Sequence, residues 1–180
     1  MRIAQVVLMS FMACLAAQGA TLTLAPVNGA LAGPTGSTVG WGFTIQNTAA
    51  GTWIEITSAR FCSGTSGTNT ACTAIPLGIF TDIVSGFNDI VVGLSPDSTS
   101  VTQSFSAGSM GIGSFLITAA SGTATGQIVL TYNQFSRSPH DPNFNPNTDT
   151  VSTDNFLTSP ASVTVTGTGN PQSIDRKSVV

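Results

Sequence analysis

The sequence predicts an all-β protein, an antiparallel β-sandwich of about seven to nine strands joined by loops rich in Gly, Ser, Pro and Asn. Three observations support this fold class. Apolar residues recur at every second position in short segments, turn-forming residues separate these segments, and no stretch keeps a helical period. Residues 20–168 suit one domain, and neither a repeat of fixed length nor a long linker divides them.

The period of two is clearest in the first half of the chain. Leu22 and Leu24 alternate with threonines, and Ile54 and Ile56 begin a segment that ends at Cys62. Alternation of this kind is typical of a strand with one buried face, so we place Trp41 in the core. The side chains expected to share its buried face are Val39, Phe43 and Ile45.

The same pattern places the other strands. One helix of about two turns is expected at 80–87, where Gly86 limits its length. Everything between the strands has turn chemistry and is expected to form loops. In chain order, the expected strands are 21–24, 39–46, 54–62, 89–93, 100–105, 113–118, 127–133 and 162–166.

The first 19 residues have the composition of a secretory signal peptide. Arg2 precedes a mostly apolar run over 3–17, and Ala17 and Gly19 are small residues at the positions before a cut. The run is shorter than the roughly 20 residues that a membrane-spanning helix needs. We therefore expect removal of 1–19 and secretion of the rest. A lipoprotein anchored through Cys14 is the alternative, although apolar residues continue beyond that cysteine.

The last residues differ from the rest of the chain. Residues 175–180, DRKSVV, contain the only lysine and can be back-translated into the start of a widely used sequencing adapter. We expect 169–180 to be a linker followed by an artefactual tail that replaces a sorting or anchor segment. A natural short basic tail is the alternative.

The expected secreted domain has few charges. Only Arg60 and Arg137 are basic within 20–168, and the whole chain has a net charge of −3. Charged residues make up 7% of the chain, against about 25% in an average globular domain. Without a basic surface to hold phosphates, we expect no nucleic-acid partner. A surface of hydroxyls and amides favours an extracellular protein that adheres or self-associates.

Cys62 and Cys72 flank a segment of Gly, Ser, Thr and Asn that has the composition of a loop. Secretion implies an oxidising compartment, so we expect these two residues to form a disulfide. Closing this loop would stabilise the fold by roughly 2–3 kcal/mol. A metal site would need more soft ligands than two thiols and a distant histidine.

A segment after the 127–133 strand has oxygen-bearing side chains at positions 1, 3, 5 and 9 of a loop that starts at Asp141. A calcium loop of the EF-hand type also needs Gly at position 6 and Glu at position 12, where this chain has Pro146 and Ser152. The alternative is that these side chains cap successive turns. The weak calcium candidates are Asp141, Asn143, Asn145 and Asp149.

We expect no catalytic residues and, calcium aside, no cofactor. His140 is the only histidine, and its neighbour Asp141 points away from it on an extended chain, so they are not expected to form a catalytic pair. The chain lacks a nucleophile elbow, and Glu55 is the sole glutamate, which leaves no evident glycosidase pair. Trp53 lies opposite the apolar face of its strand and is the candidate for glycan contact through ring stacking.

Three blocks resemble a known group of secreted proteins. They are WGFTIQNT at 41–48, the segment 78–117 that begins GIFTDIVSGFNDIVVG, and the segment 126–166 that begins GQIVLTYNQFSRSPHD. On these blocks the chain resembles the PEP-CTERM group, whose members are sorted by an exosortase, in a subset with no assigned activity. The resemblance implies a Pro-Glu-Pro signature, a membrane-spanning helix and a basic cluster at the C-terminus. The chain departs from this pattern after Gln172.

The resemblance also implies association with the cell envelope and the exopolysaccharide matrix, and it assigns no catalytic residue. We therefore expect a non-enzymatic, secreted cell-surface or extracellular-matrix protein, associated with exopolysaccharide and biofilm. Expected partners are exopolysaccharide or matrix proteins, with an exosortase for the full-length protein and membrane contact only through the missing C-terminal anchor. The alternatives are a carbohydrate-binding module that uses Trp53 and a secreted hydrolase, which a single histidine disfavours.

Overall fold

The computed structural model describes residues 19–63, 72–87 and 90–167. Most of the expected signal peptide (1–18), the centre of the cysteine loop (64–71) and the expected tail (169–180) lie outside this part of the chain. The described elements are β1 (Ala20–Ala25), η1 (Val27–Gly29), β2 (Ala30–Pro34), β3 (Thr38–Asn47), β4 (Trp53–Ser63), β5 (Gly78–Asp82), α1 (Val84–Phe87), β6 (Val91–Val92), β7 (Ser100–Gln103), β8 (Gly113–Ile117), β9 (Gly122–Phe135), α2 (Pro146–Asp149) and β10 (Thr150–Thr166).

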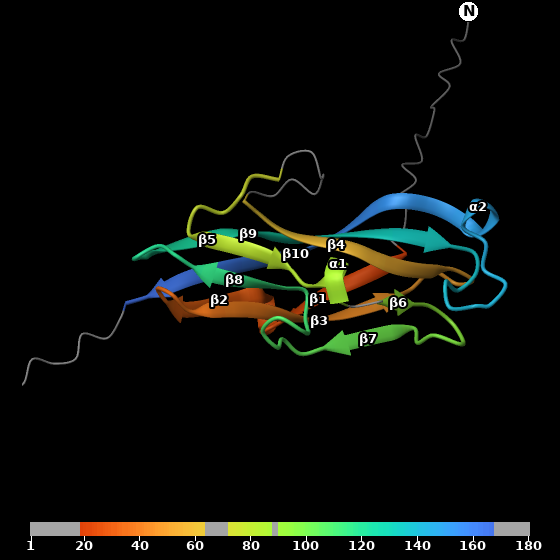
Figure 1. The fold of residues 1–180 in the computed structure, drawn as a ribbon, viewed down its shortest axis with the longest axis horizontal. Coiled ribbons are helices and arrows are strands. Elements are labelled where there is room, and N and C mark those ends of the chain that lie inside the picture. The colour runs from red at the N-terminus through yellow and green to blue at the C-terminus, as the bar shows by residue number, and fades with distance from the viewer. Residues whose placement is uncertain (1–18, 64–71, 88–89, 168–180) are drawn as a thin grey trace, which may run out of the picture.

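Two sheets pack against each other, which confirms the predicted β-sandwich (Figure 1). The first sheet has the order β1-β3-β8-β5, with β7 also paired to β3. The second has the order β2-β10-β9-β4-β6. The pairs of named strands are antiparallel except β2 and β10, which run parallel. No described helix is long and apolar enough to cross a lipid bilayer.

The first strand segment of the chain belongs to both sheets. β1 pairs with β3 in the first sheet, and after Pro26 and the short turn η1 the chain continues as β2 beside β10 in the second. Asn28 and Gly29 turn the chain with φ values of +63° and +62°. The Trp41 indole N–H donates a 2.8 Å hydrogen bond to the Gly29 carbonyl oxygen, which holds this crossing against the core. One continuous segment thus supplies an edge strand to each sheet, β1 to the first and β2 to the second.

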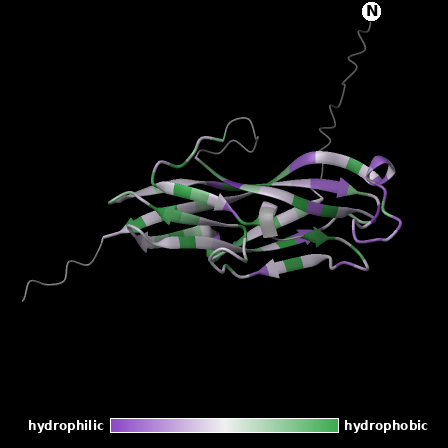
Figure 2. Ribbon diagram, in the orientation of Figure 1, coloured by the Kyte–Doolittle hydropathy of each residue, from purple (hydrophilic) through white to green (hydrophobic). Residues whose placement is uncertain are grey.

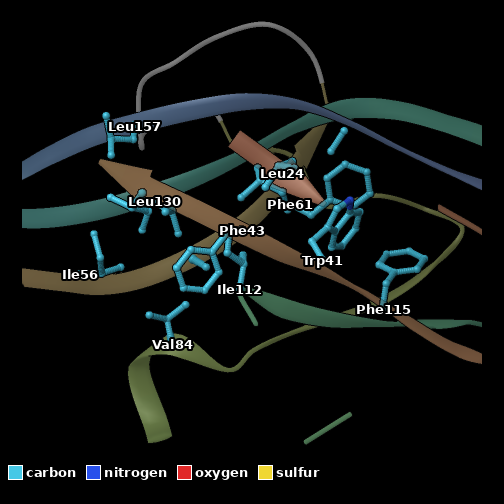
Figure 3. Packing of buried hydrophobic residues seen from close by; sticks show 14 of the residues in the cluster. Leu24, Trp41, Phe43, Ile56, Phe61, Val84, Ile112, Phe115, Leu130 and Leu157 are labelled. Atoms are coloured by element: carbon cyan, nitrogen blue, oxygen red, sulfur yellow. The ribbon is translucent and has the colours of Figure 1, made fainter. Parts of the chain in front are cut away.

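Large apolar side chains fill the space between the sheets (Figure 3). Trp41 is fully buried, as predicted from the alternation along its strand. Its ring centroid lies 5.0 Å from that of Phe61, and Phe61 in turn packs edge-on against Phe115 at 5.7 Å. Rings from β3, β4 and β8 therefore join both sheets at one place, and tilted contacts of this kind add to the stabilisation by area burial alone.

The prediction of a two-turn helix over 80–87 is wrong in its first half. Phe80 lies in β5, opposite Phe115 of β8, and only the single turn α1 is helical. The Asp82 carboxylate accepts hydrogen bonds from the backbone N–H groups of Val84 and Ser85, so the helix begins after the strand instead of replacing it. Tertiary pairing with β8 overrides the local apolar spacing.

The other differences concern strand length and number. The strand expected at 162–166 extends back to Thr150, and the one expected at 127–133 runs over the whole of β9. β10 keeps pairing with β9 through two register shifts, one of which contains Asp154 at a φ of +55°. The strand expected at 89–93 is reduced to the two residues of β6 within the described range. β2 was not anticipated, because ALAGP has no alternating apolar pattern of its own.

We expect Gly29→Ala to destabilise the protein more than Gly51→Ala does. Both glycines have positive φ, +62° and +73°, so either substitution strains the backbone by roughly 1–2 kcal/mol. A methyl group at Gly29 would also lie 2.5 Å from the Pro160 carbonyl oxygen, whereas nothing lies within 4 Å at Gly51. This crowding costs about 1–3 kcal/mol more. Urea-induced unfolding measures both variants, and equal losses would contradict a close approach at the crossing.

Tyr132 gives a spectroscopic test of the core, because it is the only tyrosine in the chain. Burial raises the pKa of its phenol. Its contribution to stability is therefore complete below the unfolded pKa of about 10, and is lost as the pH rises through the folded value. We expect phenolate absorbance to appear at a higher pH in native buffer than in urea. Coincident titration curves would show that the phenol is not buried.

Candidate functional site

The loop between β9 and β10 is folded by its own polar side chains. An Asp141 carboxylate oxygen accepts a 2.8 Å hydrogen bond from the backbone N–H of Asn143. The Asn145 side-chain oxygen accepts from the N–H of Asn147 at 3.0 Å, and Asp149 accepts from the N–H of Asn145 at 2.8 Å. These are the turn caps that the sequence analysis gave as the alternative to calcium ligation.

Arg137 lies beside both carboxylates of the weak calcium candidate. Its guanidinium nitrogens are 3.6 Å from an Asp141 oxygen and 3.5 Å from an Asp149 oxygen. The hydrogen bond from the Asn143 backbone, followed by the charge of Arg137, lowers the pKa of Asp141. A calcium ion at Asp141, Asn143, Asn145 and Asp149 would have to compete with this cation. Among the described residues no group of three or more His, Cys, Asp and Glu side chains is placed to hold a metal.

His140 pairs with a carboxylate that is distant in sequence. Its Nδ1 lies 2.7 Å from an oxygen of Asp97, in the loop between β6 and β7, while the second Asp97 oxygen accepts from the Ser138 hydroxyl. The Asp97 side chain is 7% exposed and Ser138 is 1% exposed. In a catalytic triad the serine hydroxyl is held by the imidazole. Here it donates to the carboxylate and is buried, so the three side chains tie two loops together.

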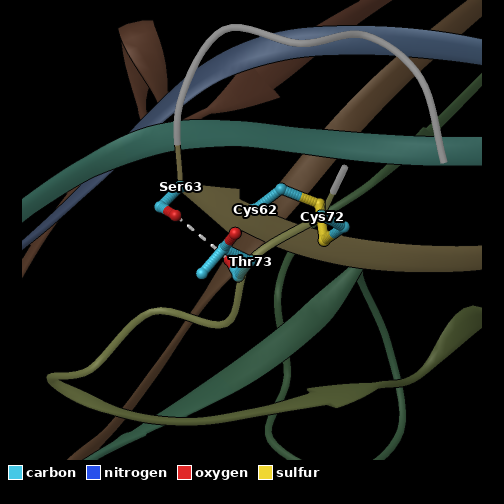
Figure 4. The surroundings of a disulfide bond; sticks show 4 residues. All are labelled: Cys62, Ser63, Cys72 and Thr73. Carbon is cyan, nitrogen blue, oxygen red and sulfur yellow. Dashed lines mark hydrogen bonds between the residues drawn. A yellow bond between two sulfur atoms is a disulfide. The ribbon is translucent and has the colours of Figure 1, made fainter. Parts of the chain in front are cut away.

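The expected disulfide between Cys62 and Cys72 is present. The S–S distance is 1.96 Å and the Cα–Cα distance is 4.8 Å. Next to it, Ser63 donates both its backbone N–H and its hydroxyl to the Thr73 carbonyl oxygen, at 3.0 and 3.3 Å (Figure 4). The cross-link and these hydrogen bonds close the base of the loop at the end of β4.

Trp53, the candidate for glycan contact, is half-buried. Its indole ring covers Gly93, where a Cβ atom would lie 2.1 Å from the ring carbon Cδ1. The indole N–H donates a 3.1 Å hydrogen bond to the Leu94 carbonyl oxygen. These contacts attach the segment after β6 to the start of β4, and they leave only part of the ring to solvent.

A group of polar side chains lies on the outer face of the first sheet, over β1, β3 and β7. The strand register places Thr23, Thr44 and Thr102 in one row across the three strands, and Thr21, Gln46 and Ser100 in the next row. Thr44 and Thr102 share a hydrogen bond of 2.8 Å between their hydroxyl oxygens. Five of these six residues are exposed, Thr44 is half-buried, and none is ionisable. We call Thr21, Thr23, Thr44, Gln46, Ser100 and Thr102 the β3 polar array.

The β3 polar array was not predicted from the sequence. Its local signal was visible, because Thr21 and Thr23 alternate with leucines, and Thr44 and Gln46 alternate with Phe43 and Ile45. The alternation says which residues share a face of one strand. It does not say which strands are neighbours, and the array depends on β1 and β7 lying on either side of β3.

No protein-family model matches this chain, and no match was found among the curated proteins.

Calcium is expected to leave the unfolding temperature of the protein unchanged, because Arg137 lies beside both Asp141 and Asp149, offsets one of their two negative charges and would repel a second cation. In an Arg137→Gln variant the two carboxylates lose this cation, and calcium should then raise the unfolding temperature by roughly 2–4 °C for each kcal/mol of binding free energy. Calorimetry in calcium and in chelator measures both proteins. A calcium-dependent rise for the unmodified chain would instead support calcium binding.

Proposed function

We propose that this protein is a non-enzymatic, secreted β-sandwich of the cell surface or extracellular matrix. The observation that carries the proposal is the β3 polar array, an exposed group of hydroxyl and amide side chains over three strands that contains no charged residue. Such a surface offers hydrogen-bond donors and acceptors to an uncharged exopolysaccharide, which we propose as the partner in preference to another matrix protein.

The composition and the disulfide support the extracellular part of this proposal. Charged residues make up 7% of the chain, which leaves hydroxyls and amides to cover the surface. The Cys62–Cys72 cross-link is compatible with an oxidising compartment. Membership of the PEP-CTERM group, processing by an exosortase and a C-terminal membrane anchor belong to the same proposal, and they rest on the resemblance of the three sequence blocks.

The hydrogen bonds of the β3 polar array support a binding role. A Thr44–Thr102 hydrogen bond across the strands fixes the direction of two hydroxyls before a ligand arrives. Neighbouring strands are spaced by about 4.8 Å, and alternate residues along a strand by about 6.8 Å. Side chains held at regular spacing by a rigid sheet lose little conformational entropy when a ligand binds.

Binding to uncharged polysaccharides tests this proposal. Dextran, galactomannan and cellulose serve as neutral probes and alginate as an anionic one, with affinity electrophoresis for the soluble polymers and sedimentation for cellulose. We expect binding to at least one neutral polymer. The triple variant Thr23→Val, Thr44→Val and Thr102→Val should bind at least about tenfold more weakly, since each hydroxyl contributes roughly 0.5–1.5 kcal/mol.

A matched control keeps the fold and changes exposed threonines outside the array. Thr38→Val in β3 and Thr81→Val in β5 remove two exposed hydroxyls of the same sheet. These substitutions should leave the affinity unchanged. Binding to none of the neutral polymers, or equal affinity of the triple variant and the unmodified protein, contradicts the proposal.

A further inference from the structure

The second sheet carries a polar array that matches the first. The register of β9 and β10 places Thr123 opposite Thr164 and Thr125 opposite Ser162, with their side chains on the outer face. Thr123 and Thr164 share a hydrogen bond of 3.1 Å between their hydroxyl oxygens. The two threonines of β9 are exposed, and the two residues of β10 are half-buried. We call Thr123, Thr125, Ser162 and Thr164 the β10 polar array.

Small side chains extend the β10 polar array over a third strand. β2 runs parallel to β10, and Ala30 and Ala32 lie beside Ser162 and Thr164 in the register. Both alanines are exposed. The β2 neighbours of Ser162 and Thr164 are thus alanines, whose methyl groups leave a long polymer room to approach the hydroxyls of these rows from the side of β2.

The two arrays belong to different sheets and so face in opposite directions. Leu24, Phe43 and Ile45 of the first sheet, and Val163 and Val165 of the second, point into the shared core. The arrays occupy the other faces of the same strands. A ligand on one array is therefore separated from a ligand on the other by the thickness of the sandwich, and both can be bound at once.

Neither polar array contains an ionisable side chain, and the described ion pairs lie in loops. The ion pairs of Arg137 and the Asp97–His140 pair are in the loops near α2, and Figure 2 shows hydrophilic residues gathered at that end of the sandwich. Glu55 and Arg60 are on β4. The exposed Arg60 lies on the same outer face as the β10 polar array, where its register partner Val129 is four residues along β9 from Thr125. Neither array contains an ionisable side chain or a large exposed apolar one, which are the groups that anchor anionic polymers and protein partners. Hydroxyls that donate and accept are complementary to an uncharged polyol.

We propose that one molecule bridges two chains of an uncharged polysaccharide, one on the β3 polar array and one on the β10 polar array. This inference rests on the proposed function and adds to it the ligand class, the second site and the consequence of having two. Two weak sites on one rigid body raise the apparent affinity for a long polymer through effective concentration. They also make the protein a cross-link between polymer chains.

Variants of each array separate binding from bridging. The first carries Thr23→Val, Thr44→Val and Thr102→Val, the second carries Thr123→Val, Thr125→Val and Thr164→Val, and a third combines all six. Affinity electrophoresis measures binding to galactomannan and dextran, and light scattering and viscosity of the same solutions measure cross-linking. Light scattering of the protein without polymer shows whether it associates with itself.

We expect the unmodified protein to bind and to raise the viscosity of the polymer solution. Each single-array variant should still bind but lose at least about ninety per cent of the viscosity increase, because a one-sided molecule cannot join two chains. The combined variant should do neither. If a triple valine variant fails to fold, Thr23→Lys or Thr125→Lys blocks the same array with one bulky charge.

The outcomes distinguish this inference from the proposed function. If the unmodified protein binds none of the neutral polymers, both fail. If a single-array variant that binds still cross-links as well as the unmodified protein, the bridging inference fails and the proposed function stands. Aggregation of the protein in the absence of polymer, at the concentrations that raise the viscosity, also overturns bridging through two polysaccharide sites.

Discussion

The hydrogen bond from the Trp41 indole to the Gly29 carbonyl oxygen fixes the place where the chain leaves one sheet and enters the other. Trp41 is the largest fully buried side chain, so its position is set by the core, and it holds the crossing in turn. Gly29 lies so close to the Pro160 carbonyl that no side chain fits there. Because of this crossing, β1 lies beside β3 and contributes Thr21 and Thr23 to the β3 polar array, and β2 lies beside β10 and places Ala30 and Ala32 next to the β10 polar array.

Charge and hydrogen bonding are distributed unevenly over the molecule. At the end that carries α2, buried Asp97 joins His140 and Ser138, and Arg137 joins two further carboxylates. Each of these contacts satisfies a polar group within the protein and orders a loop. The outer faces of the sheets have hydroxyls and no ionic groups in their arrays. Because the side chains of the arrays are uncharged, the affinity of a bound polymer would depend on the number of hydrogen bonds that it makes with their hydroxyl and amide groups.

The spacing of apolar residues along the chain predicted which side chains are buried, but it did not predict which strands pair. The alternation over 39–46 placed Trp41, Phe43 and Ile45 in the core correctly, because one buried face forces a period of two. The helix expected at 80–87 was wrong where pairing of β5 with β8 governs the backbone. β2 was missed, because a short edge strand of Ala and Gly is held by its neighbour β10. The partner of His140 was not predicted, because Asp97 is 43 residues away in sequence.

The sequence by itself determined the all-β class, the buried face of each long strand, the disulfide between Cys62 and Cys72, and a surface of hydroxyls in place of charges. These properties depend on residue type and on spacing along the chain, which the sequence states directly. The tertiary structure alone decided which strands are neighbours and in what register. Strand order brings Thr23, Thr44 and Thr102 into one row and places a second array on the opposite sheet. The reason is physical, because hydrogen bonds between strands join residues from distant parts of the chain, and their register is set by the packing of the whole core.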